Sequence, residues 1–235
     1  MSGKVLLFVL SEVGDKLSES EFNDWYDNEH IPLRTVLSGF HTATRLIQAD
    51  NRKPTWAAIY DISDIDFLKS DAYTNLARTR SPREADLLGR IGLLDRRIYT
   101  LNESGPTTIS PEFAGHTNGM ALLPISFDVP PDFEAEFDRW YNEEHIALLS
   151  KVPGWLRTRR FILADSGVTG ILKEVSEYKT PPKFLAIHEY KSADITDTPE
   201  FKLATSTPWR TRVMDHVLRD ERRIFKVHKT FGSKA

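Results

Sequence analysis

Two histidines occupy matching places in a segment that occurs twice in the chain. His30 follows Trp25-Tyr26-Asp27-Asn28-Glu29, and His145 follows Trp140-Tyr141-Asn142-Glu143-Glu144. Imidazole titrates near neutral pH and can give or take a proton without a cofactor. Both histidines lie near the expected C-terminal end of a helix, where the helix dipole favours the protonated form. The pattern therefore predicts general-acid chemistry, with capping of the last helical turn as the alternative.

A glutamate precedes each of these histidines and lies four residues after a tryptophan. The spacing places Glu29 and Glu144 on the helix face that carries the tryptophan, where a buried carboxylate needs a partner. Arg45 and Arg160 lie at matching positions on the next expected strand. We interpret each Glu and Arg as a structural ion pair, with orientation of the neighbouring histidine by the glutamate as the alternative.

A phenol and an imidazole take equivalent positions on the third expected strand of each copy. Tyr60 and His188 share a strand face with Trp56 and Phe184 by period-two counting. That face either lines a cavity, where both groups could act on one ligand, or packs on helices. His41, on the second expected strand, is a weaker candidate for the cavity wall.

The composition excludes several classes of partner and chemistry. The 31 Lys+Arg and 34 Asp+Glu leave a net charge of −3, so there is no basic surplus for nucleic acid. Cysteine is absent, which rules out disulfides, thiol nucleophiles and zinc–thiolate sites. The apolar run at residues 5–10 is too short for a signal peptide or a membrane span. We therefore expect a cytoplasmic protein.

An internal repeat sets the predicted architecture, because residues 21–33 and 136–148 are identical at eight of thirteen positions. Each copy reads as strand, helix, strand, strand, helix, strand, the ferredoxin-like order. In the first copy, apolar residues at helical spacing predict one buried helix face carrying Phe22, Trp25, Leu33 and Val36. Hydroxyl residues before proline, at Ser81-Pro82 and Thr207-Pro208, predict the starts of later helices.

The predicted fold class is α+β, with two tandem ferredoxin-like repeats whose antiparallel sheets pack into a pseudo-dimeric α/β barrel. The predicted domains are residues 1–101 and 119–231, joined by a linker at 102–118 that is rich in Gly, Pro, Ser and Thr. The second copy has thirteen extra residues in one loop, at about residues 165–182, which could cover one end of the barrel.

The segment from Trp25 to Leu33 resembles the EthD-like members of the dimeric α/β-barrel superfamily, whose first helix ends in an aromatic pair followed by Glu, His and Pro-Leu. The second copy departs from this pattern at Ala147, which predicts a straighter helix there. The resemblance implies a ligand cavity, often a further dimerisation, and relatives that are cofactor-independent enzymes of polyketide and aromatic metabolism. Dehydratases, decarboxylases, cyclases, isomerases and monooxygenases all occur among them.

The combined prediction is a cofactor-independent acid–base enzyme that dehydrates, decarboxylates, cyclises or isomerises a small aromatic or polyketide-like molecule. A histidine (His30, His145 or His188) moves the proton, and Tyr60 donates a hydrogen bond to the developing oxyanion. The alternatives are a cofactor-free monooxygenase and a non-catalytic binding or stress-related protein.

The remaining predicted site residues share a place on the expected cavity wall; they are His41, Trp25, Trp140, Trp56, Phe184, Arg45, Arg160, Glu29 and Glu144. Packing in the core is the alternative for the aromatic members of this set. No metal or cofactor is predicted, although His30, His145 and a glutamate could converge on a metal ion. The expected partner is a small hydrophobic or aromatic ligand, with no nucleic acid or membrane partner and with a homodimer left open.

Overall fold

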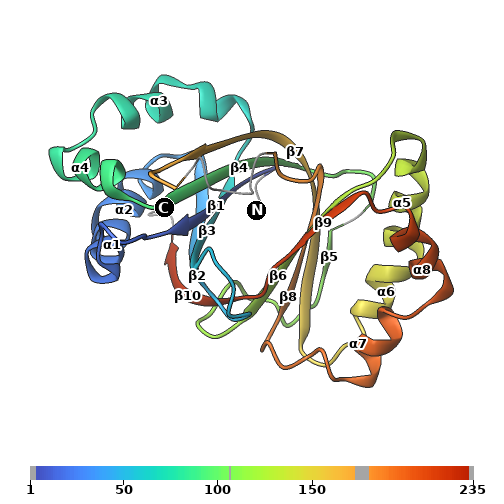
Figure 1. The fold of residues 1–235 in the computed structure, drawn as a ribbon. Coiled ribbons are helices and arrows are strands. Elements are labelled where there is room, and N and C mark those ends of the chain that lie inside the picture. The colour runs from blue at the N-terminus through green and yellow to red at the C-terminus, as the bar shows by residue number, and fades with distance from the viewer. Residues whose placement is uncertain (1–3, 106, 173–179, 233–235) are drawn as a thin grey trace. The chain divides into compact units, whose positions relative to one another are not determined.

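The computed structural model describes residues 4–105, 107–172 and 180–232 (Figure 1). Each repeat has a buried, largely apolar strand that pairs with a neighbour on both sides. β1 (Val5–Glu12) is buried along its full length and pairs antiparallel with β3 on one side and β4 on the other. β6 (Ala121–Asp128) pairs antiparallel with β8 and with β9. Such continuous apolar runs are typical of strands covered on both faces.

The first of two units comprises the described residues of Met1–Thr100, Ala164–Pro181 and His228–Ala235. Its strands follow the order β2-β3-β1-β4, which is the ferredoxin-like order. They are β2 (Phe40–Gln48), β3 (Trp56–Ile62), β1 and β4 (Leu93–Leu101). The helices are α1 (Glu19–Trp25), a π-helical turn (Tyr26–His30), α2 (Ile31–Thr35), a 3-10 helix (Asp66–Lys69), α3 (Asp71–Arg78) and α4 (Pro82–Arg90).

The second unit comprises Leu101–Leu163 and Pro182–Val227 and repeats this order of elements as β7-β8-β6-β9. Its strands are β5 (Thr108–Ile109), which pairs with β7, then β6, β7 (Trp155–Thr169), β8 (Phe184–Tyr190), β9 (Arg219–Arg222) and β10 (Phe225–Gly232). Its helices are a 3-10 helix (Pro131–Phe133), α5 (Glu134–Trp140), a π-helical turn (Tyr141–His145), α6 (Ile146–Leu149), α7 (Pro199–Ala204) and α8 (Pro208–Asp215). The predicted α+β class with two tandem ferredoxin-like repeats is confirmed.

Two parts of the prediction for the second copy need correction. The last strand, expected at residues 222–227, is divided into β9 and β10, and the residues of β10 from 228 onward belong to the first unit. The extra loop, expected from about residue 165, begins as a continuation of β7 to Thr169, and residues 164–181 also belong to the first unit. Its centre, residues 173–179, lies outside the described residues.

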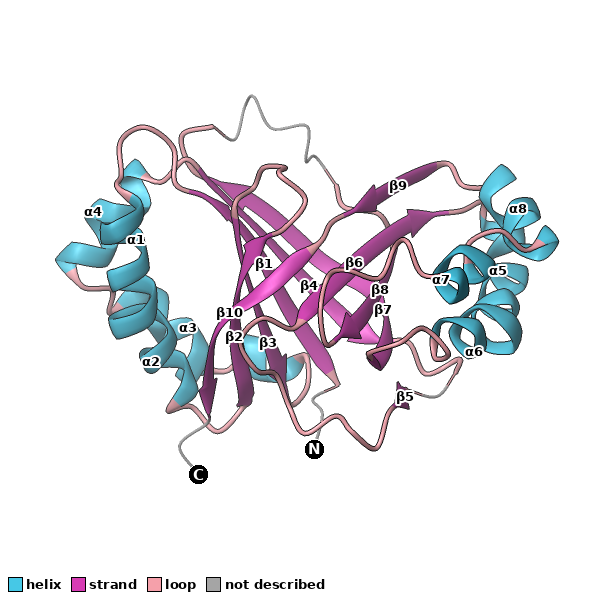
Figure 2. Ribbon diagram, turned by 90° about the horizontal axis from the view of Figure 1, so that it is seen from below, coloured by secondary structure: helices cyan, strands magenta, loops and turns pink. Residues whose placement is uncertain are grey.

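Helices cover one face of the sheet in each unit (Figure 2), and the apolar side chains between them form the core. In the first unit, Phe22, Trp25 and Tyr26 from the helices pack with Trp56 and Tyr60 from β3. Hydroxyl side chains start the helices as predicted: Ser81 and Thr207 each accept a hydrogen bond from the backbone N–H three residues later. None of the helices in the described part of the chain combines the length and apolar character needed to cross a bilayer.

A π-helical turn interrupts the first long helix of each unit at the same place in the repeat. The turn carries one residue more than an α-helical turn would, so everything after it is rotated by about 100° relative to a continuous α-helix. For this reason Leu33 and Val36, predicted to be buried, are 44% and 60% exposed, whereas Ile31 and Thr35 face the core. The same turn is present before Ala147, so the turn does not depend on the proline that the first unit has at the equivalent position.

The close approach of two glycines at the ends of β1 and β4 gives a test of the first unit's packing. Gly14 has φ +76°, and a Cβ there would lie 2.9 Å from Gly92 Cα. We expect Gly14→Ala to lower the free energy of unfolding by about 2 kcal/mol, because an L side chain strains this backbone and clashes. Gly89→Ala in α4 is the control, since a Cβ there meets nothing within 4 Å. It should leave stability unchanged or raise it by up to about 1 kcal/mol in urea unfolding.

Candidate functional site

A cavity of about 570 Å³ lies within the first unit, with strands on one side and helices on the other. Leu7, Val9 and Tyr60 line it from the sheet, and Tyr26 and His30 from the π-helical turn. Its size is in the range of pockets that bind small organic molecules. Tyr60 therefore reaches a cavity, but from the face of β3 that packs on helices, which decides between the two placements that the sequence left open.

His30 forms a hydrogen-bonded pair with Glu84 at the wall of this cavity. His30 Nδ1 lies 2.8 Å from Glu84 Oε1, and the glutamate side chain is 4% exposed. Because a carboxylate oxygen only accepts, Nδ1–H donates and Nε2 is the nitrogen left without a proton. The pairing fixes both the tautomer and the orientation of the ring, as an acid does for the histidine of a hydrolase triad.

The helix start at Ser81 positions Glu84 opposite His30. Ser81 Oγ accepts the Glu84 backbone N–H at 3.0 Å and donates its own proton to Glu29 Oε1. Glu29 is thereby tied to the N-cap of α4, and Glu84, which bonds His30, lies three residues after that cap. The second unit has the same arrangement, because Thr207 Oγ1 donates to Glu144 Oε1 at 2.6 Å and caps α8. The two glutamates therefore hold helices together.

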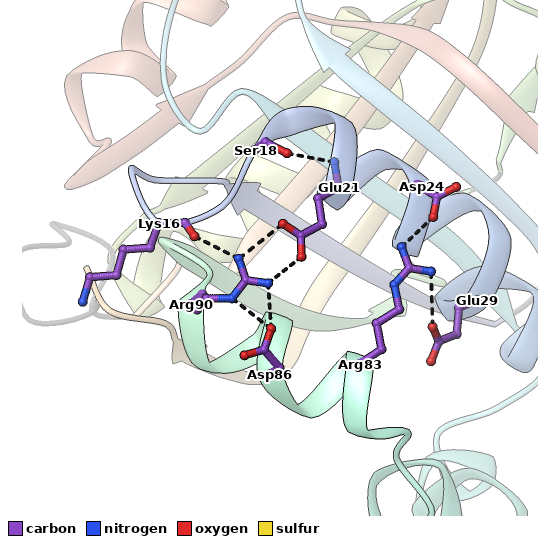
Figure 3. Close-up of polar contacts among 8 residues, drawn as sticks. All are labelled: Lys16, Ser18, Glu21, Asp24, Glu29, Arg83, Asp86 and Arg90. Atoms are coloured by element: carbon purple, nitrogen blue, oxygen red, sulfur yellow. Dashed lines mark hydrogen bonds and ion pairs between the residues drawn. The ribbon is translucent and has the colours of Figure 1, made fainter.

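Ion pairs on the outer side of α4 fix its position against α1 (Figure 3). Arg90 bonds Glu21, Asp86 and the backbone oxygen of Lys16, and Arg83 bonds Asp24 at 2.5 Å. These contacts are partly exposed, so each contributes little by itself. Together they set the register of the two helices, and the opposite side of α4 then presents Glu84 to His30.

The prediction of Glu–Arg ion pairs is wrong. Arg45 and Arg160 instead bind other residues of the helical segments that carry Glu29 and Glu144. Arg45 bonds Asp27 Oδ1 at 2.8 Å and Asn23 Oδ1 at 2.7 Å. Arg160 bonds Asp138 and Asn142, the equivalent positions of the repeat. Both guanidinium groups also lie over aromatic rings of their units, including Tyr26 and Tyr141. These contacts stabilise the helix on the sheet and leave the glutamates to the helix caps.

The expectation that the helix dipole favours protonated histidines is also wrong. The helices continue past both residues, and His30 and His145 are enclosed by core side chains. A neighbouring carboxylate favours the imidazolium form, but burial acts against it and holds the pKa of His30 well below its usual value. The charges of Arg34, Arg80 and Arg45 lower it further. His30 is therefore a neutral imidazole at pH 7, suited to accept a proton.

Two tyrosines adjoin His30 in the cavity. The hydroxyls of Tyr26 and Tyr60 lie 3.4 Å apart, and the Tyr26 ring centroid is 4.8 Å from that of His30. Burial raises the pKa of both phenols, most strongly that of Tyr60, so both keep their protons at neutral pH. Tyr60 donates to Tyr26, so the Tyr26 proton is left to donate a hydrogen bond to an oxygen of a bound ligand.

The equivalent pocket of the second unit is small and chemically different. Its volume is about 50 Å³, and it is lined by His145, His188 and Tyr141. Arg210 occupies the position of Glu84, three residues after the N-cap of α8. Among the described residues, His145 Nδ1 has no hydrogen-bond partner, whereas His188 Nδ1 lies 3.0 Å from Thr158 Oγ1. Burial lowers the pKa of both histidines, to about 4 for His188.

The other predicted site residues have mainly structural surroundings. Trp25 and Trp140 are buried core residues; Trp140 stacks on His145, and Trp25 contacts His30 with its ring tilted by 57°. Trp56 packs in the core and against His228, and Phe184 packs in the second core. His41 lies at the irregularity of β2 between Phe40 and Thr42, outside the lining of the cavity. In the described part of the chain, no three His, Asp or Glu side chains gather as metal ligands.

The sequence reasoning missed Glu84, Tyr26 and Arg34 as members of the site. A signal for Glu84 was present in the comparison of the two copies. Glu84 and Arg210 hold the same position after a matching helix start but carry opposite charges.

Comparison with known proteins gives similarity of fold over the whole chain. No protein family model and no curated protein sequence matches. An anthrone oxidase-like protein is 13% identical, with a TM-score of 0.62, and the match covers 100% of this chain and 97% of the other. A candidate monooxygenase from Fusobacterium nucleatum subsp. nucleatum is 15% identical, with a TM-score of 0.59 and the same coverage.

A candidate monooxygenase from Lactobacillus acidophilus is 9% identical, with a TM-score of 0.56, over 99% of this chain and 97% of the other. What is shared is the fold. At these identities the likeness carries no chemistry, and the resemblance to EthD-like proteins stays a prediction.

The buried histidines predict that acid weakens the fold. His188 has a pKa of about 4 in the folded chain, because of burial and the charge of Arg160, against about 6.5 when unfolded. Below pH 6.5 the unfolded chain binds a proton that the folded chain does not, so stability falls as the pH falls. We expect this side chain to account for about 2 kcal/mol of lost unfolding free energy between pH 6.5 and 5.

The measurement is urea unfolding at both pH values for the native chain and for His188→Gln, which keeps an amide beside Thr158. The variant should lose less stability on acidification. Equal losses in the two proteins would contradict the assignment.

Proposed function

We propose that the first unit is an acid–base catalyst that removes a proton from a small aromatic or polyketide-like molecule bound in its cavity. The observation that carries this proposal is the pair of His30 and Glu84 beside a cavity of about 570 Å³. General-base catalysis needs three features that are present here. They are a neutral imidazole with a fixed tautomer, a carboxylate bonded to its other nitrogen, and space for a ligand beside it.

In the proposed mechanism, Nε2 of His30 accepts a proton from an acidic C–H or O–H group of the ligand. The electron pair left on the ligand delocalises onto a carbonyl oxygen, which accepts a hydrogen bond from Tyr26, and Tyr60 supports this bond by donating to the Tyr26 oxygen. The imidazolium that forms is stabilised by the Glu84 carboxylate. Return of the proton at another atom gives isomerisation, and its transfer to a leaving hydroxyl gives loss of water. No step requires a cofactor.

A cofactor-free monooxygenase is the second candidate, and it begins with the same proton transfer. The resulting carbanion would form a C–O bond to dioxygen rather than receive a proton back. Cleavage of the O–O bond in the resulting hydroperoxide, with loss of a second proton from the same carbon, gives a ketone and water. This reaction is considered because the proteins that share the fold include an anthrone oxidase-like protein and two candidate monooxygenases. The residues of the site support the first step of both reactions equally.

A non-catalytic role fits the second unit better than the first. Its pocket of about 50 Å³ leaves little space beside His145, and Arg210 replaces the carboxylate that would support a base. We therefore assign the chemistry to the first unit.

Anthrone, a flat ketone with an acidic methylene group, is a suitable probe of the proton transfer. We expect the protein to accelerate deuterium uptake at that methylene in D₂O under nitrogen, followed by mass spectrometry. His30→Gln should reduce the acceleration by at least about 100-fold, because it removes the base. Glu84→Gln should also reduce it, because the amide keeps the hydrogen bond but not the charge.

His216→Gln, at an exposed histidine of the second unit, is the control and should behave as the native chain. Deuterium uptake that survives His30→Gln but is lost in His145→Gln would reverse the assignment of the units. Admitting air then separates the two candidates. Oxygen consumption with formation of anthraquinone indicates a monooxygenase, and its absence favours the proton-transfer enzyme.

A further inference from the structure

Three arginines, Arg34, Arg80 and Arg96, line the cavity of the first unit. Arg34, from α2, and Arg80, between α3 and α4, both line the cavity. Arg34 Nη1 donates to the backbone oxygen of His30 at 2.7 Å. Arg96 lies near Asp165, at 3.8 Å, and bonds the hydroxyl of Tyr73. Within the described residues, Arg34 and Arg80 have no carboxylate partner.

The cavity wall carries more positively charged side chains than negatively charged ones. Glu84 is the one acidic side chain in the described lining, and its carboxylate is engaged by His30. The rest of the wall is mainly aliphatic and aromatic, with Leu7, Leu88 and Tyr60 among its members. A flat apolar body with an acidic group at one edge matches this distribution of side chains.

We propose that the cavity takes an aromatic carboxylate, with its acid group held by Arg80 and Arg34 and its ring system placed against Tyr26 and Tyr60. The planar guanidinium group can bond both oxygens of a carboxylate, which fixes the orientation of the bound ring as well as its position. This proposal names the class of ligand for the proposed reaction. It rests on the proposed function, which places the reaction in this cavity.

The charge of Arg80 lies close enough to His30 to affect its titration, so an anion bound there lies near the proposed base. Arg34 bonds the backbone of His30 itself. A carboxylate on these two groups therefore brings the ring beside Nε2 and Tyr60, where proton removal is proposed.

Isothermal titration of the full chain with 3-hydroxy-2-naphthoate and with 3-hydroxy-2-naphthamide tests the proposal, since the two probes differ mainly in charge. We expect the carboxylate to bind at least about tenfold more tightly than the amide. Arg80→Gln should remove most of this preference without changing the affinity for the amide. Arg78→Gln is the matched control, because Arg78 bonds Asn75 and lies outside the cavity lining. It should bind both probes as the native chain does.

Equal affinity for the two probes, no binding of the carboxylate at millimolar concentration, or equal effects of Arg80→Gln and Arg78→Gln would each overturn the proposal. Raised salt should weaken the carboxylate more than the amide. The proposed function is tested by a different measurement. It would be contradicted if His30→Gln left the rate of deuterium uptake unchanged. A preference for the carboxylate that depends on Arg80 would then still identify a binding site for aromatic acids.

Discussion

The contact between His30 and Glu84 joins two helices that are separated by two strands in the sequence. It requires α4 to start at Ser81, α4 to lie against α1 in one register, and the π-helical turn to present the imidazole toward α4. Each of these conditions has its own stabilising interactions, in the Ser81 cap, the Arg83 and Arg90 ion pairs, and the aromatic core around Trp25. A pair of partly buried polar groups is costly unless both are satisfied, so the surrounding structure has to position them well.

The two units show how one arrangement can serve two purposes. Both keep the π-helical turn, the buried tryptophan beside a histidine, the arginine bound to the helix, and the glutamate bonded to a helix cap. These shared features are the structural frame. The units differ where Glu84 is replaced by Arg210, where Tyr60 is replaced by His188, and in the space beside the histidine. A structural role explains the features that stay the same, and the differences locate the candidate chemistry.

Much of the fold was predictable from the sequence, because strand and helix periodicity, the helix starts at Ser81 and Thr207, and the repeat all act locally. The π-helical turn was not predictable in this way, and it alone accounts for the wrong burial of Leu33 and Val36. The candidate site was harder to predict from the sequence than the fold. His30 and Tyr60 were identified by their chemistry, but Glu84 looked like an ordinary residue of a helix start, and its pairing with His30 depends on how two helices pack. The protonation of the histidines was misjudged because burial outweighs the helix dipole.

The π-helical turn also bears on how such a protein can change over generations. The additional residue in the turn determines which side chain of this segment points toward α4. In this chain, that side chain is His30. Loss of a single codon within the turn would restore an α-helix, and the residues after it would keep their directions, because the lost residue is the one that the turn accommodates. Only the residues of the turn itself, His30 among them, would change direction, while the core on either side could remain. A change of one residue in length could thus create or erase a reactive centre without disturbing the packing around it.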